Sequence, residues 1–376
     1  MEKKAQAVSM ILFTLFLSAL GIITLLSDKQ DYSETENRAL AQMPEFSKEK
    51  YFDASYFTEL SDYLCDHFYG RSDWIRLMTK SELASGKIEI NGTYITPNRH
   101  IEHLTEPDFA VVDEAVNAIN EYTAETTTPV YVMLAPTAAG IYADELYSDA
   151  PQYAEEKLID YVYAKLDENV KSLDIFMTMK SAYEEDIYYK NDHHWTSLGA
   201  YYAYYFAISK LGFTPVDFSQ YNIERISSDF YGSLYSQTLY SGFGPDSVDI
   251  FNCENGIEIT SVEINDGLKT TQYDSLYFRE YLDKKDKYSV FLGGNYPIVN
   301  ITTQAQSGKK LLLIKDSFAN CFVPFLTQHY SEITLVDMRY INIGLANFVN
   351  ADDYSQILFL YNASGFSGDT DLKKIT

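Results

Sequence analysis

The feature that most constrains this chain is an apolar run over residues 7–26, close to its N-terminus. About 20 apolar residues in helical conformation are enough to span a hydrocarbon core of about 30 Å. Lys3 and Lys4 precede the run, and the stretch from Ser18 to Gly21 matches a signal-peptidase site poorly. We predict a retained signal anchor over residues 1–28, with the rest of the chain outside the cytoplasm, because flanking positive charges stay inside.

Charge and cysteine content narrow the classes of partner and site. The net charge is −25 at pH 7, whereas binding to a nucleic-acid backbone relies on clustered Lys and Arg, so nucleic acid is not an expected partner. The three cysteines show no CxxC or Cys/His pattern typical of zinc sites. A bridge between Cys65 and Cys253 and three buried free thiols are both open, and the second is favoured. The sequence predicts no cofactor and no metal.

After the apolar run the chain reads as a linker followed by helices. Residues 29–50 are rich in polar side chains, as a juxtamembrane linker would be. Between residues 51 and 86 the apolar positions recur near every 3.6 residues, and Gly70 interrupts them. We predict helices on either side of Gly70, at the start of an α/β domain over residues 51–376.

Helical and strand patterns then alternate. The ranges 111–125 and 155–170 are helical in pattern, and the short apolar run 129–134 lies between them. A further helix is predicted from Thr196 or Ser197 to residue 211. Such alternation is typical of a parallel α/β sheet.

The second half of the chain continues this pattern after an interruption. The segment at about 213–288 shows no sustained period and reads as a β-rich insertion covering one edge of the sheet. Short apolar strands buried on both faces are then predicted at 288–292, 310–314, 333–336 and 356–360. A helix over 318–330 would supply one of the crossovers.

A serine follows one of these strands directly. The segment KKLLLIKDSFANCFVPFLTQHY, residues 309–330, predicts a buried strand, a sharp turn at Asp316-Ser317 and a helix from Phe318. In open α/β sheets, ligands bind at the edge formed by the carboxyl ends of the strands, where this turn is expected. Free N–H groups at the start of a helix can stabilise a developing oxyanion there. Ser317 is thus a candidate nucleophile, although a plain helix N-cap has the same pattern.

A second group of reactive side chains lies at Asn191-Asp192-His193-His194-Trp195. A carboxylate beside an imidazole fixes its tautomer and stabilises the imidazolium formed when it takes a proton from a hydroxyl. Asp192 and His194 are therefore candidate orienter and base for Ser317. The alternatives are a metal site, with Asp192, His193 and His194 as ligands, and loop histidines without a catalytic role.

The motifs DHHWTSLGAYYAY and KKLLLIKDSFANCFVPFL, with SETENRAL, YLCDHFYGRSDW, APTAAGIYAD, FLGGN and LVDMRYIN, resemble the DHHW family. That family is related to alginate O-acetylation proteins of the AlgX/AlgJ type, whose domain is SGNH-hydrolase-like. The resemblance implies a flavodoxin-like parallel sheet, circularly permuted so that Asp-x-His precedes the serine. It also implies that Ser317 is the nucleophile, His194 the base and Asp192 the orienter.

The site differs from the SGNH pattern at one position. Lys315 stands where the usual serine block carries glycine, which leaves the oxyanion donors open. The candidates are the Ser317 N–H, Asn320 and the turn Gly293-Gly294-Asn295, which is equally well read as a plain turn. Two further side chains are candidates for substrate contact. Arg339 is expected to bind substrate or to pair with Asp337. Trp195 is expected to wall the site or to anchor its loop, and the wall is favoured.

The resemblance implies an extracytoplasmic serine-dependent O-acetyltransferase or acetylesterase acting on an exopolysaccharide or cell-surface glycan. It also implies a polytopic membrane acyltransferase as the partner that brings the acetyl group. The competing interpretation is a non-catalytic glycan-binding or assembly protein of a polysaccharide export system. A third interpretation, suggested by the Asp-His-His cluster, is a metal-dependent phosphoesterase.

Overall fold

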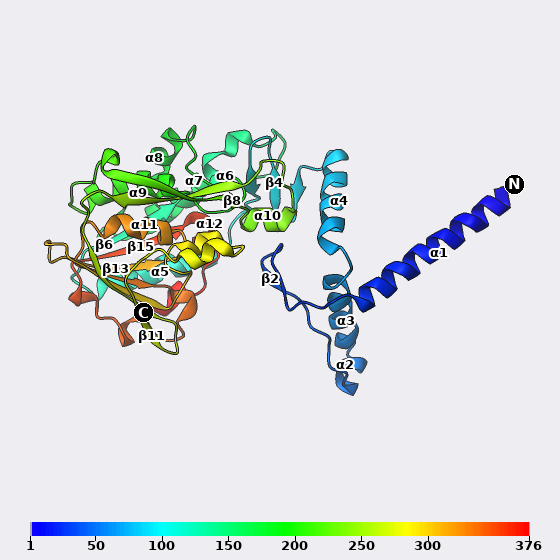
Figure 1. Cartoon of the computed structure of the whole chain (residues 1–376). Helices are drawn as coiled ribbons and strands as arrows, with labels where there is room; N and C mark the ends of the chain where they lie inside the picture. Colours follow the sequence, from blue (N-terminus) through cyan, green and yellow to red (C-terminus); the bar gives the residue numbers. More distant parts are fainter. Residues whose placement is uncertain (1, 376) are drawn as a thin grey trace. The chain divides into compact units, whose positions relative to one another are not determined.

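The computed structural model describes residues 2–375. Contacts divide the chain into two compact units (Figure 1). The first comprises the chain up to residue 87 together with residues 236–240, and the second comprises residues 88–235 and the chain from residue 241 onward. Residues 51–87, expected from the sequence to begin the α/β domain, group with the first unit by this measure.

The first unit is mainly helical. In α1 (Glu2–Leu26), residues 4–26 are apolar and long enough to cross a membrane, a property shared by signal sequences near an N-terminus. The other elements are β1 (Tyr32–Ser33), β2 (Arg38–Ala39), α2 (Lys48–Phe52), α3 (Ser55–Asp66) and α4 (Arg71–Ala84). Gly70 lies between α3 and α4 with a φ of 69°, a conformation that glycine adopts readily. The predicted break between two helices is therefore confirmed.

The second unit is built on an eight-stranded sheet with the order β11-β10-β12-β14-β13-β15-β6-β7. Its strands are β6 (Val130–Ala135), β7 (Val170–Ser172), β10 (Ile259–Asn265), β11 (Thr270–Tyr273), β12 (Ile298–Thr303), β13 (Lys310–Lys315), β14 (Glu332–Val336) and β15 (Gln356–Asn362). The strands from β14 to β7 pair in parallel, whereas β11, β10 and β12 extend one side with antiparallel pairs. The predicted α/β class with a large, mostly parallel sheet is confirmed.

The centre of this sheet is apolar on both faces. β13 reads KLLLIK and β15 reads QILFLYN, and nearly all of their residues are buried. Leu313 lies opposite Leu335 of β14 and Leu358 of β15. Strands covered on both faces need such continuous apolar runs, which is why the sequence pattern located them.

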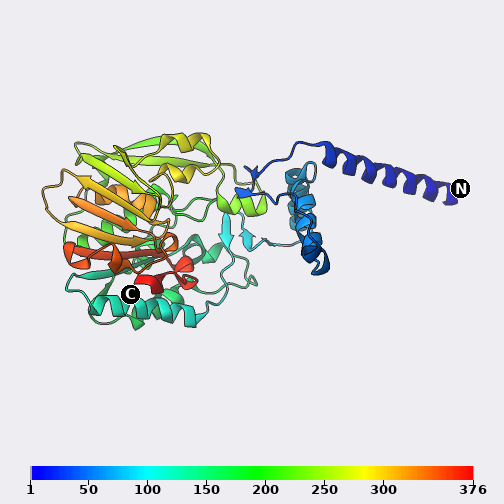
Figure 2. The same cartoon turned by 90° about the horizontal axis from the view of Figure 1, so that it is seen from below.

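Helices cover the sheet. The helices that lie wholly in the second unit are α5 (Phe109–Ala124), α6 (Ala138–Ile141), α7 (Glu155–Lys165), α8 (Phe176–Ser181), α9 (Ser197–Lys210), α11 (Ala319–Leu326) and α12 (Ala363–Ser367), whereas α10 (Ser233–Thr238) is divided between the two units. α9 packs on α11, and α5, α7 and α12 pack on one another. Figure 2 shows α5, in cyan, below the strands of the sheet.

Smaller elements complete the second unit. β3 (Glu89–Ile90), β4 (Thr93–Ile95) and β5 (His100–Glu102) form a three-stranded antiparallel sheet, and β8 (Tyr221–Phe230) pairs with β9 (Asp246–Cys253). The short 3-10 helices are η1 (Ala143–Glu145), η2 (Phe218–Gln220), η3 (Arg279–Asp283), η4 (Lys287–Val290), η5 (Met338–Tyr340), η6 (Leu345–Asn347), η7 (Ala351–Asp353) and η8 (Leu372–Ile375).

Two expectations about this region need correction, and one strand was missed. The predicted strand at 288–292 is largely the 3-10 helix η4, and the antiparallel strand β12 was not predicted. The helix expected over 318–330 ends at Leu326 and contains Pro324, which lacks the N–H that an α-helix uses. Within the β-rich segment, β10 and β11 lie at one edge of the sheet and extend it, since β10 pairs with β12.

Candidate active site

The serine turn lies at the carboxyl end of β13, in the middle of the sheet. The Asp316 carboxylate accepts the Phe318 N–H at 2.8 Å and, on its other oxygen, the Asn362 N–H at 2.7 Å and the Asn362 amide at 2.6 Å. These bonds tie the turn to the end of β15. Among residues 311–323, Ser317 alone is not buried, so the turn exposes this side chain from an otherwise enclosed segment.

The loop that carries Asp192 and His194 is held from two sides. The Asp246 carboxylate accepts the N–H groups of Lys190 and Asn191, each at 2.9 Å. The indole N–H of Trp195 donates to the Phe318 carbonyl oxygen at 2.8 Å. Trp195 thus joins the loop directly to the serine turn, although the two segments are far apart in the sequence.

The structure brings the three predicted side chains into one hydrogen-bonded chain. Ser317 Oγ lies 2.8 Å from His194 Nε2, and His194 Nδ1 lies 2.6 Å from Asp192 Oδ1. In this geometry the hydroxyl donates to Nε2 while the Nδ1–H donates to the carboxylate. Asp192 and His194 are 4% and 6% exposed, so little water competes for these bonds.

The surroundings of Asp192 favour the ionised form of its carboxyl group. Burial acts to raise its pKa, but the neighbouring His193 and His194 and the hydrogen bonds to the carboxylate outweigh it and lower the pKa below the usual value. Oδ1 accepts the backbone N–H of His194 at 3.0 Å, and Oδ2 accepts that of Ser233 at 2.8 Å. The carboxylate is therefore fixed in position beside the imidazole.

Tyr288 lies directly against the imidazole. Its phenol O–H donates to the Ser317 carbonyl oxygen at 2.9 Å and lies 3.3 Å from Cys321 Sγ. Its ring is parallel to that of His194 and in contact with it. One residue of η4 thereby holds both the serine turn and the face of the histidine.

Lys315 occupies a buried polar cluster below the turn. Its ammonium donates to Asn320 Oδ1 at 2.8 Å and to Asn295 Oδ1 at 3.0 Å, and it lies 3.8 Å from Asp337 Oδ2. Burial lowers the pKa of Lys315 to about 8, against the attraction of Asp337. The Asn320 amide donates to the Gly294 carbonyl and to Asn295. Lys315 therefore joins the end of β13 to the 293–295 turn.

The side chains proposed for substrate or oxyanion contact have other partners. The Asn320 side chain accepts a hydrogen bond from Lys315 through Oδ1 and donates one to Asn295 through Nδ2. Asn295 Oδ1 accepts from both Asn320 and Lys315. These bonds direct neither side chain at the Ser317 hydroxyl. Arg339 forms the alternative pair: Nε donates to Asp337 Oδ1 at 2.8 Å and an Nη to Oδ2 at 2.6 Å. Trp195 is fully buried and anchors the loop instead of walling a cavity.

Two backbone groups of the site face no protein partner. Within the described residues 2–375, the N–H groups of Ser317 and Gly294 donate no hydrogen bond to protein. The Gly294 φ of 116° is accessible mainly to glycine, so another residue at this position would change the conformation of the 293–295 turn. Of the predicted oxyanion donors, these two N–H groups are the ones left open.

The Asp-His-His cluster also meets the simplest geometric requirement of a metal site. Ligand atoms of Asp192, His193 and His194 lie within 4.8 Å of one another. Asp192 Oδ1 and His194 Nδ1 are already bonded to each other, and His193 Nδ1 lies 2.6 Å from Ser233 Oγ. All three candidate ligands therefore have protein partners, and they make a hydrogen-bonded site better than an ion cage.

Three contributors were missed from the sequence: Tyr288, Ser233 and Gly232. A Cβ placed on Gly232 would clash with the Asp192 side chain, lying 2.6 Å from its Cγ, so only glycine fits there. The dipeptide Gly232-Ser233 was the one sequence signal for this contact. A glycine lets the backbone approach closely enough for the Ser233 N–H to reach the Asp192 carboxylate. No pattern marks Tyr288, because its role depends on tertiary packing.

Fold and geometry together define a class of protein: an α/β protein that presents hydrogen-bonded serine, histidine and aspartate side chains at the carboxyl edge of a parallel sheet. A family model described as "DHHW protein" matches residues 104–336. The chain therefore belongs to the DHHW family, as its motifs indicated.

Two of the solved structures that this chain resembles share its fold with TM-scores well above 0.5. A crystal structure of a DHHW family protein from Eubacterium siraeum DSM 15702 is 26% identical, with a TM-score of 0.68, over 76% of this chain and 96% of that chain. Bacillus cereus PatB1 is 24% identical, with a TM-score of 0.67, over 76% and 99%. The O-acetyltransferase domain of Pseudomonas putida AlgJ matches more distantly, at 13% identity and a TM-score of 0.46, over 76% and 95%. A comparison with curated proteins found no match.

Proposed function

We propose that this chain is an extracytoplasmic, serine-dependent O-acetyltransferase, or acetylesterase, that acts on an exopolysaccharide or cell-surface glycan. The observation that carries the proposal is the 2.8 Å contact between Ser317 Oγ and His194 Nε2, with Asp192 bonded to the opposite ring nitrogen. This is the spatial arrangement that an activated serine nucleophile requires.

The proposed reaction has two half-steps. His194 Nε2 takes the proton of Ser317 Oγ as the oxygen attacks the acetyl carbonyl of a donor; the donor's leaving group departs with that proton, and acetyl-Ser317 forms. A glycan hydroxyl then gives its proton to Nε2 and attacks the acetyl carbon. The bond to Oγ breaks, and Ser317 recovers its proton from His194. Water in place of the glycan gives hydrolysis.

Each remaining group has a part in this scheme. Asp192, which is buried and negatively charged, stabilises the imidazolium formed in each half-step. The Ser317 N–H, and the Gly294 N–H across the site, are the proposed oxyanion donors. The Lys315 cluster holds the turn that carries Gly294.

Membership of the DHHW family supports the assignment, and the motif order agrees with a permuted SGNH-type domain, since Asp192 and His194 precede Ser317. PatB1, which shares the fold, has been solved with a sulfonyl adduct. We propose by analogy that a sulfonyl fluoride will react with Ser317. We also propose that α1 is a single-pass anchor and that a polytopic membrane acyltransferase supplies the acetyl group.

The decisive experiment compares the full-length chain with Ser317→Ala. Turnover of p-nitrophenyl acetate is expected to fall at least about 10³-fold in the variant. Ser209→Ala, which removes an exposed hydroxyl bonded only within α9, should retain full turnover. Mass spectrometry after treatment with a sulfonyl fluoride should place the adduct on Ser317.

Other outcomes distinguish the competing functions. Unchanged turnover and unchanged glycan acetylation in a folded Ser317→Ala protein would exclude the proposal. Binding of the polymer without turnover by the unmodified chain would favour a glycan-binding protein. Activity that disappears with a chelator and returns with a divalent cation would favour a metal enzyme built on Asp192, His193 and His194.

A further inference from the structure

The helix α3 in the first unit is amphipathic. Its apolar side chains occupy one side of the helix, at Tyr56, Phe57, Leu60, Tyr63 and Leu64, and its acidic side chains occupy the other, at Glu59, Asp62 and Asp66. None of the residues of α3 is buried. A helix of this kind normally turns its apolar side towards a protein core and its polar side towards water.

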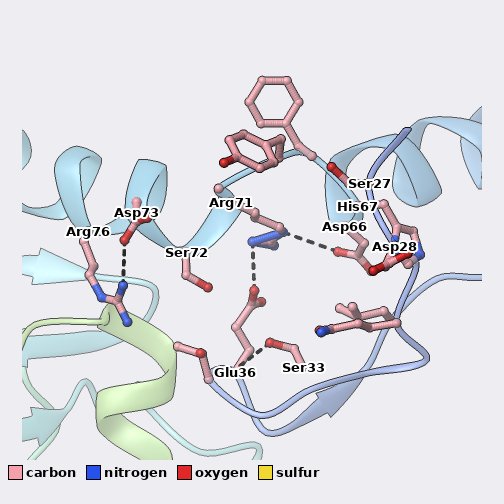
Figure 3. A pocket seen from close by; sticks show the side chains of 16 residues that line it. Ser27, Asp28, Ser33, Glu36, Asp66, His67, Arg71, Ser72, Asp73 and Arg76 are labelled. Atoms are coloured by element: carbon pink, nitrogen blue, oxygen red, sulfur yellow. Dashed lines mark hydrogen bonds and ion pairs between the residues drawn. The ribbon is translucent and has the colours of Figure 1, made fainter. Parts of the chain in front are cut away.

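Here part of the polar side contacts protein instead. Arg38 of the preceding loop donates to both carboxylate oxygens of Asp66, and the Ala41 N–H donates to the same carboxylate at 2.8 Å. Glu36 pairs with Arg38 at 2.9 Å. It also pairs with Arg71 at 2.9 Å, as Figure 3 shows. These charges hold the pKa of Asp66 at about 2, chiefly through its hydrogen bond from Arg38. The loop of residues 33–41 therefore neutralises the acidic end of α3.

The apolar side of α3 is packed against the rings of Phe46 and Tyr51 at its N-terminal end and is exposed at Phe57 and Leu64. An apolar strip runs from α3 into α4. Within each helix its members lie one or two turns apart. Between the helices the rings of Phe68 and Trp74 lie close together, with centroids 6.5 Å apart. The apolar strip consists of Phe57 (51% exposed), Leu64 (42%), Phe68 (36%), Trp74 (44%), Leu77 (57%) and Met78 (47%). Six large apolar side chains exposed along two successive helices are more than the scattered single ones that need no explanation, and they point to an interaction site.

The strip is attached to the end of the apolar N-terminal helix. The Tyr69 N–H donates to Thr24 Oγ1 in the last turn of α1 at 3.2 Å. The neighbouring Phe68 and Tyr69, both exposed, therefore lie beside the point where α1 ends. If α1 crosses a bilayer, this point is at the membrane surface, where tyrosine and tryptophan side chains concentrate.

We propose that the apolar strip lies in the lipid interface, so that α3 and α4 rest on the bilayer from which α1 emerges. The proposal rests on the proposed anchor and not on the proposed enzymatic activity. Basic residues usually draw interfacial helices to anionic lipid. Across α3 and α4, five acidic side chains outnumber three basic ones, so no net attraction to anionic lipid is expected. Contact then depends on apolar area and on the attachment to α1, and it should not weaken in high salt.

The two tryptophans of the chain permit a direct test. Trp74 belongs to the strip, whereas Trp195 is fully buried in the second unit and shielded from contact quenchers. The full-length chain is reconstituted in phosphatidylethanolamine and phosphatidylglycerol vesicles, with or without lipids brominated near the headgroup end of the acyl chain. The emission of Trp74 is the difference between the unmodified chain and Trp74→Phe. Brominated lipid should quench most of this emission, and the quenching should persist in high salt.

A matched control carries Leu268→Trp in the Trp74→Phe background. Leu268 is 96% exposed in the second unit, so its emission should be quenched by aqueous acrylamide and not by brominated lipid. Two results would overturn the proposal. Trp74 quenched by acrylamide alone would show a strip open to water, and Trp74 protected from both quenchers would show a strip covered by protein. Esterase activity of the same vesicles reports separately on the proposed function.

Discussion

The rings of Tyr288 and His194 are stacked, with centroids 3.7 Å apart and planes inclined by 9°. An offset or parallel aromatic contact of this kind contributes about 0.5–1.5 kcal/mol and fixes the plane of the imidazole. The same tyrosine holds the Ser317 carbonyl through its O–H. One side chain thus contacts both the proposed base, His194, and the turn that carries the proposed nucleophile, Ser317.

Two substitutions separate these effects. Tyr288→Phe keeps the stack and loses the hydrogen bond, so stability should fall by about 1 kcal/mol with a small change in kcat. Tyr288→Leu loses both, and kcat should fall by up to about tenfold more. Urea unfolding and steady-state esterase kinetics on both variants check the prediction. Equal kcat values for the two variants would show that the stack does not orient His194.

Asp192→Asn should nearly abolish turnover. An amide cannot accept hydrogen bonds on its nitrogen, whereas Asp192 accepts from His194 Nδ1, the His194 N–H and the Ser233 N–H. The imidazole then loses its orienting charge, and kcat should fall about 10³- to 10⁴-fold, with KM changed less. A variant that remains folded by circular dichroism yet keeps more than a tenth of the activity would contradict the assigned role.

Gly232→Ala tests the packing around the same carboxylate. The added Cβ would overlap Asp192 and push it away from His194. Displacement of a catalytic group by about 1 Å is expected to reduce kcat about 10²-fold. Gly368→Ala provides the control, because no atom lies within 4 Å of its added Cβ, and it should leave kcat unchanged. Equal kinetics for the two alanine variants would count against the prediction.

The buried Lys315 predicts a specific pH dependence of stability. Its pKa is about 8 in the folded protein against the ordinary 10.5, so the folded chain binds fewer protons than the unfolded chain between these values. Stability should therefore rise with pH through this interval, by up to about 1.4 kcal/mol for each pH unit. Lys315→Met removes this contribution, whereas Lys157→Met, which removes an exposed lysine of α7, does not.

Urea midpoints measured for the three proteins at pH 7.5 and pH 10 provide the check. The difference between the unmodified chain and Lys315→Met should shift in favour of the unmodified chain at the higher pH. A constant difference across this range would show that the lysine titrates alike in the folded and unfolded states.

Much of the sheet was predictable because its central strands are buried on both faces. The runs at 129–134, 310–314 and 356–360 correspond closely to β6, β13 and β15. β12 was missed because its six residues IVNITT alternate between buried and partly exposed and carry polar side chains. The run at 288–292 has strand-forming residues, but the packing of Tyr288 on the site selects a 3-10 helix.

The site was predictable only where chemistry leaves a local motif. Ser317 follows a recognisable strand, and Asp192 and His194 lie two residues apart, so their side chains could be named before their contact was known. Tyr288 comes from a segment with no motif, and its place depends on how that segment packs. Of the two roles considered for Trp195, the structure shows the loop anchor and not the favoured wall, because a motif does not reveal which side of a loop is buried.

The position of β15 has a consequence for when the site can form. This last strand lies between β13 and β6, and its terminal Asn362 holds the Asp316 carboxylate beside the serine. A chain that is synthesised from its N-terminus must therefore reach residue 362 before Ser317 acquires its final surroundings. Fragments that stop before residue 356 would leave β13 with an open edge and the serine turn without its support.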